Sequence, residues 1–274
     1  MKKTLNLNGT LLSLEKPCVM GILNITPDSF YAGSRVQTEK EILSQAEKHL
    51  SEGATFLDVG GYSSRPNAEH ISEQEELQRV LPAIRLIRQH FPQAYISVDT
   101  FRAEVAKQAI YEGASIVNDI SGGSLDSEMF PTVAQAKAPY VLMHMKGTPQ
   151  TMTTLTHYDN ILAEILQYFA QKIEKLTELG IKDIIIDVGF GFAKTLEQNF
   201  YLLKHLQQFH TLGLPLLVGL SRKSMIWRTL QISPEEALNG TTALNMVALL
   251  QGATILRVHD VKEAMQTITL WCNL

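Results

Sequence analysis

Three segments of the chain share one pattern of hydrophobic and polar positions. They are GATFLD from Gly53, GASIVN from Gly113 and GATILR from Gly252. In each, a glycine typical of a helix end precedes a small residue, a Ser or Thr, two large apolar residues and a polar residue. This pattern predicts a buried strand with a hydrogen-bonding side chain at its carboxyl end. Several such strands predict a ring of polar groups at one end of a parallel α/β protein.

Apolar runs of strand length recur along the whole chain. They begin at Cys18, Ala54, Tyr95, Ser115, Pro139, Ile184, Pro215 and Ala253. Their nearly continuous apolar character is typical of strands that are covered on both faces, as in parallel sheets. Helical segments fit between the runs, and no Pro-, Ser- or Gly-rich linker divides the 274 residues. The sequence therefore favours one (β/α)8 TIM barrel with a short N-terminal extension, a single domain over residues 1–274.

A doubly wound parallel sheet is the alternative architecture. Such sheets normally carry a GxGxxG phosphate turn after the first strand, and GILNITPDSF from Gly21 lacks one. The barrel is therefore the preferred prediction.

Several helix ends carry sequence signals. N-terminal signals are Thr38 with Glu41, Ser72 with Glu75, and Ser233 with Pro234 and Glu236. The segment 160–179 predicts an amphipathic helix with one apolar stripe formed by Ile161, Ile165, Phe169, Ile173 and Leu176. Gly180 is expected to end that helix.

Composition and charge limit the classes of binding partner and the cellular compartment that we expect. The net charge of −4 gives no electrostatic footprint for nucleic acid or for an anionic membrane surface. Cys18 and Cys272 stand at opposite ends of the chain, which predicts neither a disulfide framework nor a cysteine metal site. The N-terminal segment has no unbroken apolar stretch of a signal peptide. We expect a soluble cytoplasmic protein with neither nucleic-acid nor membrane partners.

The polar residues at the predicted strand ends should converge on one face of the barrel. They are Asn24, Asp58, Asp99, Asn118, Asp119, His144, Asp187, Ser221, Arg222, Lys223, Arg257 and His259. Asp99, Asn118 and Asp187 suit a flat heterocycle with several N–H donors, because carboxylates accept paired hydrogen bonds.

A second set suits an anion: Asn24, Arg65, Arg257 and His259. The amide oxygen of Asn24, together with phosphate oxygens, would hold Mg²⁺. Ser221 opens the segment SRKS at a predicted helix start, where an anion often binds. The helix dipole alone contributes only about 0.3–2 kcal/mol, so Arg222 and Lys223 are expected to supply charge.

Ordered motifs along the chain resemble those of the dihydropteroate synthase family. They are MGILNITPDSF from Met20, GGYSSRP from Gly60, SVDT from Ser97, NDISGG from Asn118, MHMKGTPQTM from Met143, DVGFGFAK from Asp187, GLSRKS from Gly219 and RVHDV from Arg257. The resemblance runs from Met20 to about Ala264. It implies condensation of (7,8-dihydropterin-6-yl)methyl diphosphate with 4-aminobenzoate, which gives 7,8-dihydropteroate and diphosphate.

The resemblance also implies residue roles. The pterin would be bound by Asp99, Asn118, Asp187 and Lys223. The diphosphate would be bound by Ser64, Arg65, Arg257 and His259, with Mg²⁺ on Asn24. Val258 is a further expected substrate-binding residue. The 4-aminobenzoate pocket, which sulfonamides share, would include Phe30, Ser64, Pro66, Lys223 and Ser224. Arg65, Lys223, Arg257 and His259 are the expected catalytic residues.

The chemistry of this reaction agrees with a ring of polar residues that has one set for the heterocycle and another for the anion. Loss of diphosphate leaves a methylene cation conjugated to the pterin, so no side chain has to act as a nucleophile. Positive groups and metal at the rim would stabilise the leaving group, and acidic groups under the ring would stabilise the cation. Two loops, TPDSFYAGSRV from Thr26 and YSSRPNAEHIS from Tyr62, are expected to close the site.

The second loop departs from the family's usual GGESTRPGA. Tyr62 replaces Glu, Ser64 replaces Thr and Asn67 replaces Gly. These changes leave the pterin and phosphate residues in place but touch the 4-aminobenzoate pocket. The hypothesis that follows is that this protein binds sulfonamides differently from common bacterial relatives.

Two other functions remain open at this point. A methyltetrahydrofolate-binding methyltransferase module would share the barrel and pterin contacts but would not need the diphosphate set. A non-catalytic pterin-binding paralogue would bind ligand without releasing diphosphate. Apolar residues in LNMVALLQG from Leu244 and in the terminal MQTITLWCNL are expected to form a homodimer face.

Overall fold

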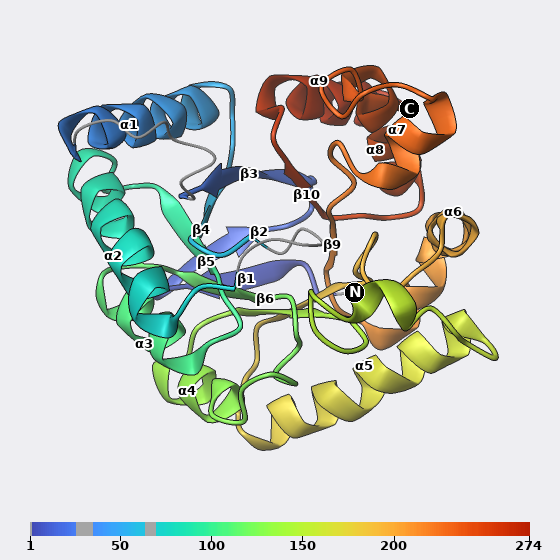
Figure 1. Cartoon of the computed structure of the whole chain (residues 1–274), viewed down its shortest axis with the longest axis horizontal. Coiled ribbons are helices and arrows are strands. Elements are labelled where there is room, and N and C mark those ends of the chain that lie inside the picture. Colours follow the sequence, from blue (N-terminus) through green and yellow to red (C-terminus); the bar gives the residue numbers. More distant parts are fainter. Residues whose placement is uncertain (1, 26–34, 64–69) are drawn as a thin grey trace.

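The structure is a computed structural model that describes residues 2–25, 35–63 and 70–274. In this part of the chain, eight parallel strands close into a barrel that helices surround (Figure 1). The strand order around the barrel is β10-β3-β4-β5-β6-β7-β8-β9. The predicted (β/α)8 barrel is confirmed, because each strand pairs in parallel with its neighbour in sequence and β10 pairs with β3.

The barrel strands match the eight predicted apolar runs. They are β3 (Cys18–Asn24), β4 (Phe56–Gly60), β5 (Tyr95–Asp99), β6 (Ile116–Asp119), β7 (Tyr140–Met143), β8 (Ile184–Asp187), β9 (Leu216–Val218) and β10 (Ile255–Val258).

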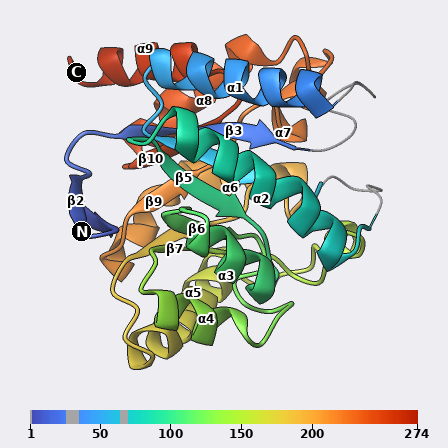
Figure 2. The same ribbon diagram turned by 90° about the vertical axis from the view of Figure 1, so that its left-hand side faces the viewer.

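The helices lie outside the barrel and follow its strands in sequence (Figures 1 and 2). They are α1 (Arg35–Ser51), α2 (Glu73–His90), α3 (Ala103–Tyr111), α4 (Met129–Ala136), α5 (Ile161–Glu178), α6 (Leu196–Lys204), α7 (Ser224–Leu230), α8 (Leu238–Leu250) and α9 (Val261–Trp271). Short 3-10 turns are formed by Met152–Thr154 and Leu206–Leu212. None of the helices in the described residues is long and apolar enough to cross a membrane.

Side chains alternate along each strand between the barrel interior and the outer helices. One buried cluster fills the interior and includes Met20, Phe56, Ile116, Val141, Ile185, Leu217 and Ile255. The neighbouring strand residues, such as Leu57 and Val117, pack in the larger core beneath the helices. Two positions beyond four of the interior residues stand Asp58, Asn118, Asp187 and Arg257. The period of two therefore places these polar side chains on the inside.

The N-terminal extension is a β-hairpin of β1 (Thr4–Leu7) and β2 (Thr10–Ser13). Its turn residues Asn8 and Gly9 both have positive φ, 52° and 90°, as a tight hairpin turn requires. Leu5 and Leu7 are buried in the same cluster as the interior barrel residues. The hairpin therefore closes the amino-terminal end of the barrel, opposite the polar residues at the carboxyl ends of the strands.

The helix signals were correct in part. Ser72 caps α2, since its Oγ accepts the backbone N–H of Glu75 at 3.1 Å. The segment 160–179 contains α5, which ends before Gly180, at φ 83°.

Two of the predicted helix starts were wrong. The structure begins α1 at Arg35, so Thr38 lies inside the helix. Ser233 belongs to a turn before α8, where its N–H donates to Glu236 Oε2 at 3.0 Å. Capping spacing is a local signal, and a turn uses the same hydrogen bonds as a helix start.

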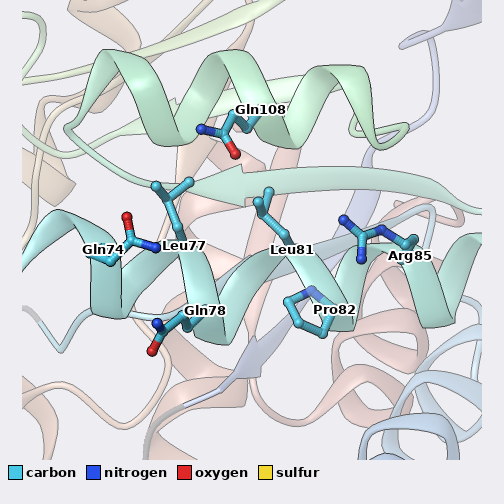
Figure 3. A pocket seen from close by; sticks show the side chains of 7 residues that line it. All are labelled: Gln74, Leu77, Gln78, Leu81, Pro82, Arg85 and Gln108. Carbon is cyan, nitrogen blue, oxygen red and sulfur yellow. The ribbon is translucent and has the colours of Figure 1, made fainter.

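A groove on the outer surface runs between α2 and α3 (Figure 3). Its lining residues are Gln74, Leu77, Gln78, Leu81, Pro82 and Arg85 of α2, with Gln108 of α3. The groove lies on the helical layer, and the strands separate it from the polar residues inside the barrel.

Candidate active site

The guanidinium group of Arg257 joins three of the polar strand ends. Its Nε donates to Asp58 Oδ2 at 2.6 Å, and its Nη2 donates to Asp99 Oδ2 at 2.6 Å. Asn118 Nδ2 donates to the same oxygen of Asp58 at 3.0 Å. Arg257 and Asp58 are 199 residues apart in the chain, so this cluster exists only because β10 closes the barrel near β4.

Burial and charge shift the pKa values of this cluster in a defined way. Burial opposes the charge of Arg257, but Asp58 and Asp99 outweigh it and raise the pKa of Arg257 above its usual value. Burial raises the pKa of Asp99 to about 7, with Arg257 opposing the shift and Asp58 adding to it. Near pH 7 Asp99 is therefore partly protonated. A ligand that donates hydrogen bonds to its carboxylate stabilises the ionised form.

A second cluster follows β8. Asp187 Oδ1 accepts the backbone N–H of Gly189 at 2.8 Å. Lys223 Nζ donates to the carbonyl of Phe190 and lies 4.8 Å from the centre of the Phe192 ring. Burial raises the pKa of Asp187, which Lys223 opposes, and burial lowers the pKa of Lys223 to about 8, which Asp187 opposes. The opposite charges of Asp187 and Lys223 therefore stabilise each other beside the loop after β8.

Lys194 supports this loop and was not predicted from the sequence as a site residue. Its buried Nζ donates to the carbonyls of Phe192 at 2.9 Å and Gly189 at 3.0 Å, and contacts His144 Nδ1 at 3.1 Å. Burial lowers the pKa of His144 to about 2, so the imidazole is neutral and Nδ1 accepts the hydrogen bond. The sequence signal was a lysine directly after the buried segment GFGFA, where a charged side chain needs several partners.

Two residues predicted to join the polar ring are used elsewhere. Asp119 follows inward-facing Asn118, so its carboxylate lies on the other side of the strand. There it accepts the Tyr140 hydroxyl at 2.6 Å and two loop N–H groups. Arg222, at φ 54°, forms a bidentate pair with Asp260 at 2.9 and 2.8 Å. The expectation that Arg222 supplies charge for an anion is corrected, because Asp260 already neutralises it.

The segment after β9 meets the end of β10 through Ser221 and His259. Ser221 Oγ lies 2.9 Å from His259 Nδ1 and accepts the His259 backbone N–H at 3.1 Å. Ser224 is the half-buried first residue of α7. The side chain of Val258 packs in the outer core, so only its backbone faces the end of the strand where substrate was predicted.

Asn24, the predicted metal ligand, is the last residue of β3 and is half-buried. It pairs in register with Gly60, and Gly60 pairs with Asp99 on the next strand. Within the described residues, no three His, Cys, Asp or Glu side chains gather as a metal site. The other predicted site residues, Phe30, Ser64, Arg65 and Pro66, and most of both predicted loops, lie outside the described residues.

Among the described residues, the structure therefore brings the predicted heterocycle-binding residues to the same end of the barrel as Asn24, Arg257 and His259. Asp99 and Asn118 are register partners on adjacent strands, and Asp99 bonds Arg257. Asp187 is close enough to Arg257 and Lys223 for both charges to lower its pKa against the effect of burial. Two carboxylates and an amide lie near Arg257 and Lys223, and His259 follows Arg257 by two residues, an arrangement able to bind a ligand with N–H donors and an anionic tail.

Comparisons with a family model, with related sequences and with solved structures all point to the same family. Residues 20–259 match the family model of pterin binding enzymes. Dihydropteroate synthase of Escherichia coli K12 is 44% identical over 262 residues, which cover 95% of this chain and 92% of that protein. Dihydropteroate synthase of Synechocystis is 47% identical over 257 residues, with 93% and 88% covered.

Solved structures are similar over the whole chain. A Yersinia pestis dihydropteroate synthase with a sulfonamide drug complex has a TM-score of 0.90 and 41% identity, with 97% of both chains covered. A Xanthomonas albilineans dihydropteroate synthase with 4-aminobenzoic acid has a TM-score of 0.92 and 37% identity, with 100% and 98% covered.

Proposed function

Since this chain belongs to the pterin-binding enzymes and, among them, to the dihydropteroate synthases, we propose how its polar ring performs their reaction. The chain is a transferase of folate biosynthesis. It joins the methylene carbon of (7,8-dihydropterin-6-yl)methyl diphosphate to the nitrogen of 4-aminobenzoate. One C–O bond breaks, one C–N bond forms, and diphosphate and a proton leave. The meeting of Arg257, Asp99 and Asn118 from three separate strands is the observation that supports this site most strongly.

The inner part of the ring is proposed to bind the pterin. Asp99 and Asp187 would accept its N–H groups, and Asn118 would add an amide that can both donate and accept. The raised pKa values of the two carboxyl groups favour this role, because a ligand N–H replaces the water that burial removed. The same negative groups stabilise the methylene cation as the diphosphate departs.

The outer part of the ring is proposed to stabilise the leaving diphosphate. Arg257 carries a fork of N–H donors that matches phosphate oxygens, and His259 stands two residues further along the chain. Arg65 is proposed for the same role on the resemblance of its motif alone. Because charge on the diphosphate grows as the C–O bond breaks, these donors bind the transition state more tightly than the substrate.

The second substrate is proposed to lie beside Lys223 and Ser224. Lys223 is held between the Phe190 carbonyl and the Phe192 ring, so its position is fixed relative to the pterin residue Asp187. Phe30, Ser64 and Pro66 complete this pocket in the proposal. The arylamine attacks the cation directly, and it loses its proton after the C–N bond has formed.

Magnesium is proposed as the metal of the reaction, with Asn24 as its protein ligand. A single half-buried amide at a strand end fits Mg²⁺, which usually keeps waters and binds substrate phosphates rather than a protein cage. When bound, the ion supplies charge neutralisation for the diphosphate. Asn24 would hold it at the rim.

We also propose a cytoplasmic homodimer whose face includes α8 and α9, which pack against each other. Leu250 at the end of α8 and Leu270 in α9 are 59% and 65% exposed. Apolar side chains that gather on one surface often mark a protein interface, and these two lie on helices that contact each other. Sedimentation equilibrium of the purified protein tests this, and a monomer at micromolar concentration would exclude the dimer.

The test of the proposed function is release of diphosphate and formation of dihydropteroate by the purified protein with both substrates. A pterin-binding paralogue would bind the pterin diphosphate without release, and a methyltransferase module would not consume 4-aminobenzoate.

Arg65→Ala separates the role of that residue from binding. We expect turnover to fall at least about 100-fold while pterin affinity changes little, because leaving-group stabilisation acts in the transition state. Equal losses of turnover and affinity would contradict the role.

A further inference from the structure

Asp58 is the one member of the Arg257 cluster to which the proposed function gives no role. It lies on β4, is fully buried, and faces the barrel interior. Its Oδ2 accepts two hydrogen bonds, from Arg257 Nε and Asn118 Nδ2. Its Oδ1 is buried and has no hydrogen-bond partner within the described residues. Burying a carboxylate oxygen without a partner lowers the free energy of unfolding. We therefore look for the role of Asp58 in the two residues that it holds.

Both partners of Asp58 are residues that the proposed function assigns to substrate. Arg257 uses Nε for Asp58 and Nη2 for Asp99, so its guanidinium is held between two carboxylates. Asp99 is also the proposed acceptor of the pterin N–H groups. The arrival of a pterin therefore competes with Arg257 for Asp99, and Arg257 needs a second anchor that substrate does not claim.

We propose that Asp58 is a positioning residue that keeps Arg257 and Asn118 in place when Asp99 turns its hydrogen bonds to the pterin. This rests on the proposed function. The Nε bond fixes the inner edge of the guanidinium and leaves the Nη groups able to exchange Asp99 for diphosphate oxygens. The Asn118 bond fixes the amide with Nδ2 toward Asp58, so that Oδ1 is left as an acceptor.

The charge of Asp58 also acts on Asp99 directly. Burial is the main cause of the raised pKa of Asp99, and Asp58, Glu76 and Asp119 raise it further while Arg257 opposes them. Replacing Asp58 by a neutral residue of the same shape removes one of these negative charges. Asp99 then ionises at lower pH, an effect that loss of packing alone would not produce.

The chain offers a matched control for this position. Ser97 on β5 pairs in register with Asp58, so it lies at the same depth in the same layer of the barrel. It is fully buried, and its Oγ has no hydrogen-bond partner in the described part of the chain. Ser97→Ala therefore perturbs the same layer without removing a hydrogen bond of Arg257 or Asn118.

The experiment compares Asp58→Asn, Ser97→Ala and wild type in steady-state turnover and in calorimetric binding of the pterin diphosphate. We expect Asp58→Asn to lower kcat/KM for the pterin diphosphate about 10- to 100-fold, as loss of a charge-assisted hydrogen bond does. The KM for 4-aminobenzoate and the Ser97→Ala values should stay within about twofold of wild type. The acid limb of pterin binding should move to lower pH by roughly one unit.

Two further variants keep the result decisive. In an Arg257→Gln background, Asp58→Asn should cost less than about threefold, because the charged partner is already gone and only the contact with Asn118 is left to change. Asp58→Glu keeps the charge but shifts the oxygens, so it should lose turnover yet retain the wild-type acid limb, and it serves if Asp58→Asn fails to fold.

An Asp58→Asn variant that matches Ser97→Ala, or effects that add in full to those of Arg257→Gln with an unmoved acid limb, would overturn the proposal. Binding without diphosphate release in wild type would instead count against the proposed function, and the binding comparison would still judge Asp58.

Discussion

Removal of Arg102 should destabilise the barrel far more than removal of a surface arginine. Arg102 precedes α3, and its side chain is 11% exposed. Nη1 donates to Glu76, which is fully buried on α2, and Nη2 donates to the Ile71 carbonyl at 2.6 Å. Arg102→Met removes the positive charge and leaves Glu76 as an unpaired carboxylate inside the protein.

The size of the loss follows from the burial of the partner. Breaking a buried ion pair by removing one member costs about 3–5 kcal/mol. In a chain of this length each kcal/mol lowers Tm by about 2 °C, so we expect a fall of about 6–10 °C. Burial already raises the pKa of Glu76, with Thr100 and Arg102 opposing. Without Arg102 that pKa rises further, so the loss should be largest at pH 8 and shrink as pH falls toward about 5.

The assay is thermal unfolding followed by circular dichroism at pH 5 and pH 8. The matched control is Arg85→Met, which breaks an exposed bidentate pair with Glu112 that also links α2 to the end of α3. We expect little change there, because water replaces the lost contacts. Adding Glu76→Gln to Arg102→Met should restore part of the stability. Equal effects of the two Arg→Met variants, or a loss that does not depend on pH, would refute the reasoning.

Two other predictions concern the site. Because burial lowers the pKa of Lys223 to about 8, its ammonium loses its proton as pH rises through that value, and kcat/KM should fall above pH 8. A pH profile of wild type and Lys223→Met checks this, since the variant should lack the alkaline limb. The Tyr62 hydroxyl accepts a hydrogen bond from Gln150 Nε2 at 2.6 Å and lies 3.3 Å from His70 Nδ1. Tyr62 precedes residues 64–69 and His70 follows them, so this contact links the two ends of that segment. Tyr62→Phe should raise the KM for 4-aminobenzoate about 2- to 10-fold and leave pterin affinity unchanged, whereas equal changes in both would contradict it.

The barrel strands could be predicted because local rules place them. β3 and β5 begin at Cys18 and Tyr95, the first residues of their predicted apolar runs. The N-terminal hairpin was not predicted as strands, although Asn8 and Gly9 form the dipeptide typical of its turn. Polar residues occur in both strands, TLNL and TLLS, so neither forms the continuous apolar run that identified the barrel strands.

The positions of the candidate site residues could be predicted where the strand period decides orientation and less well where loops do. Asn118 and Asp119 are neighbours that the sequence treated alike, yet alternation sends one to the interior and the other to a loop cap. Ile116 and Val117 are both fully buried, so the apolar pattern alone does not show which of the two polar residues faces the interior. Arg222 could not be distinguished from Lys223, because its partner Asp260 lies 38 residues away.

The sequence by itself determined the barrel, the family and the end of the barrel at which the polar strand-end residues gather. Strand period, helix caps and motif order are local properties, so one chain is enough to recognise them. Only the tertiary structure decided which polar groups share hydrogen bonds: Arg257 between Asp58 and Asp99, and Lys194 with His144. Those pairings depend on barrel closure, which brings together side chains far apart in the chain and removes the water that would otherwise satisfy them.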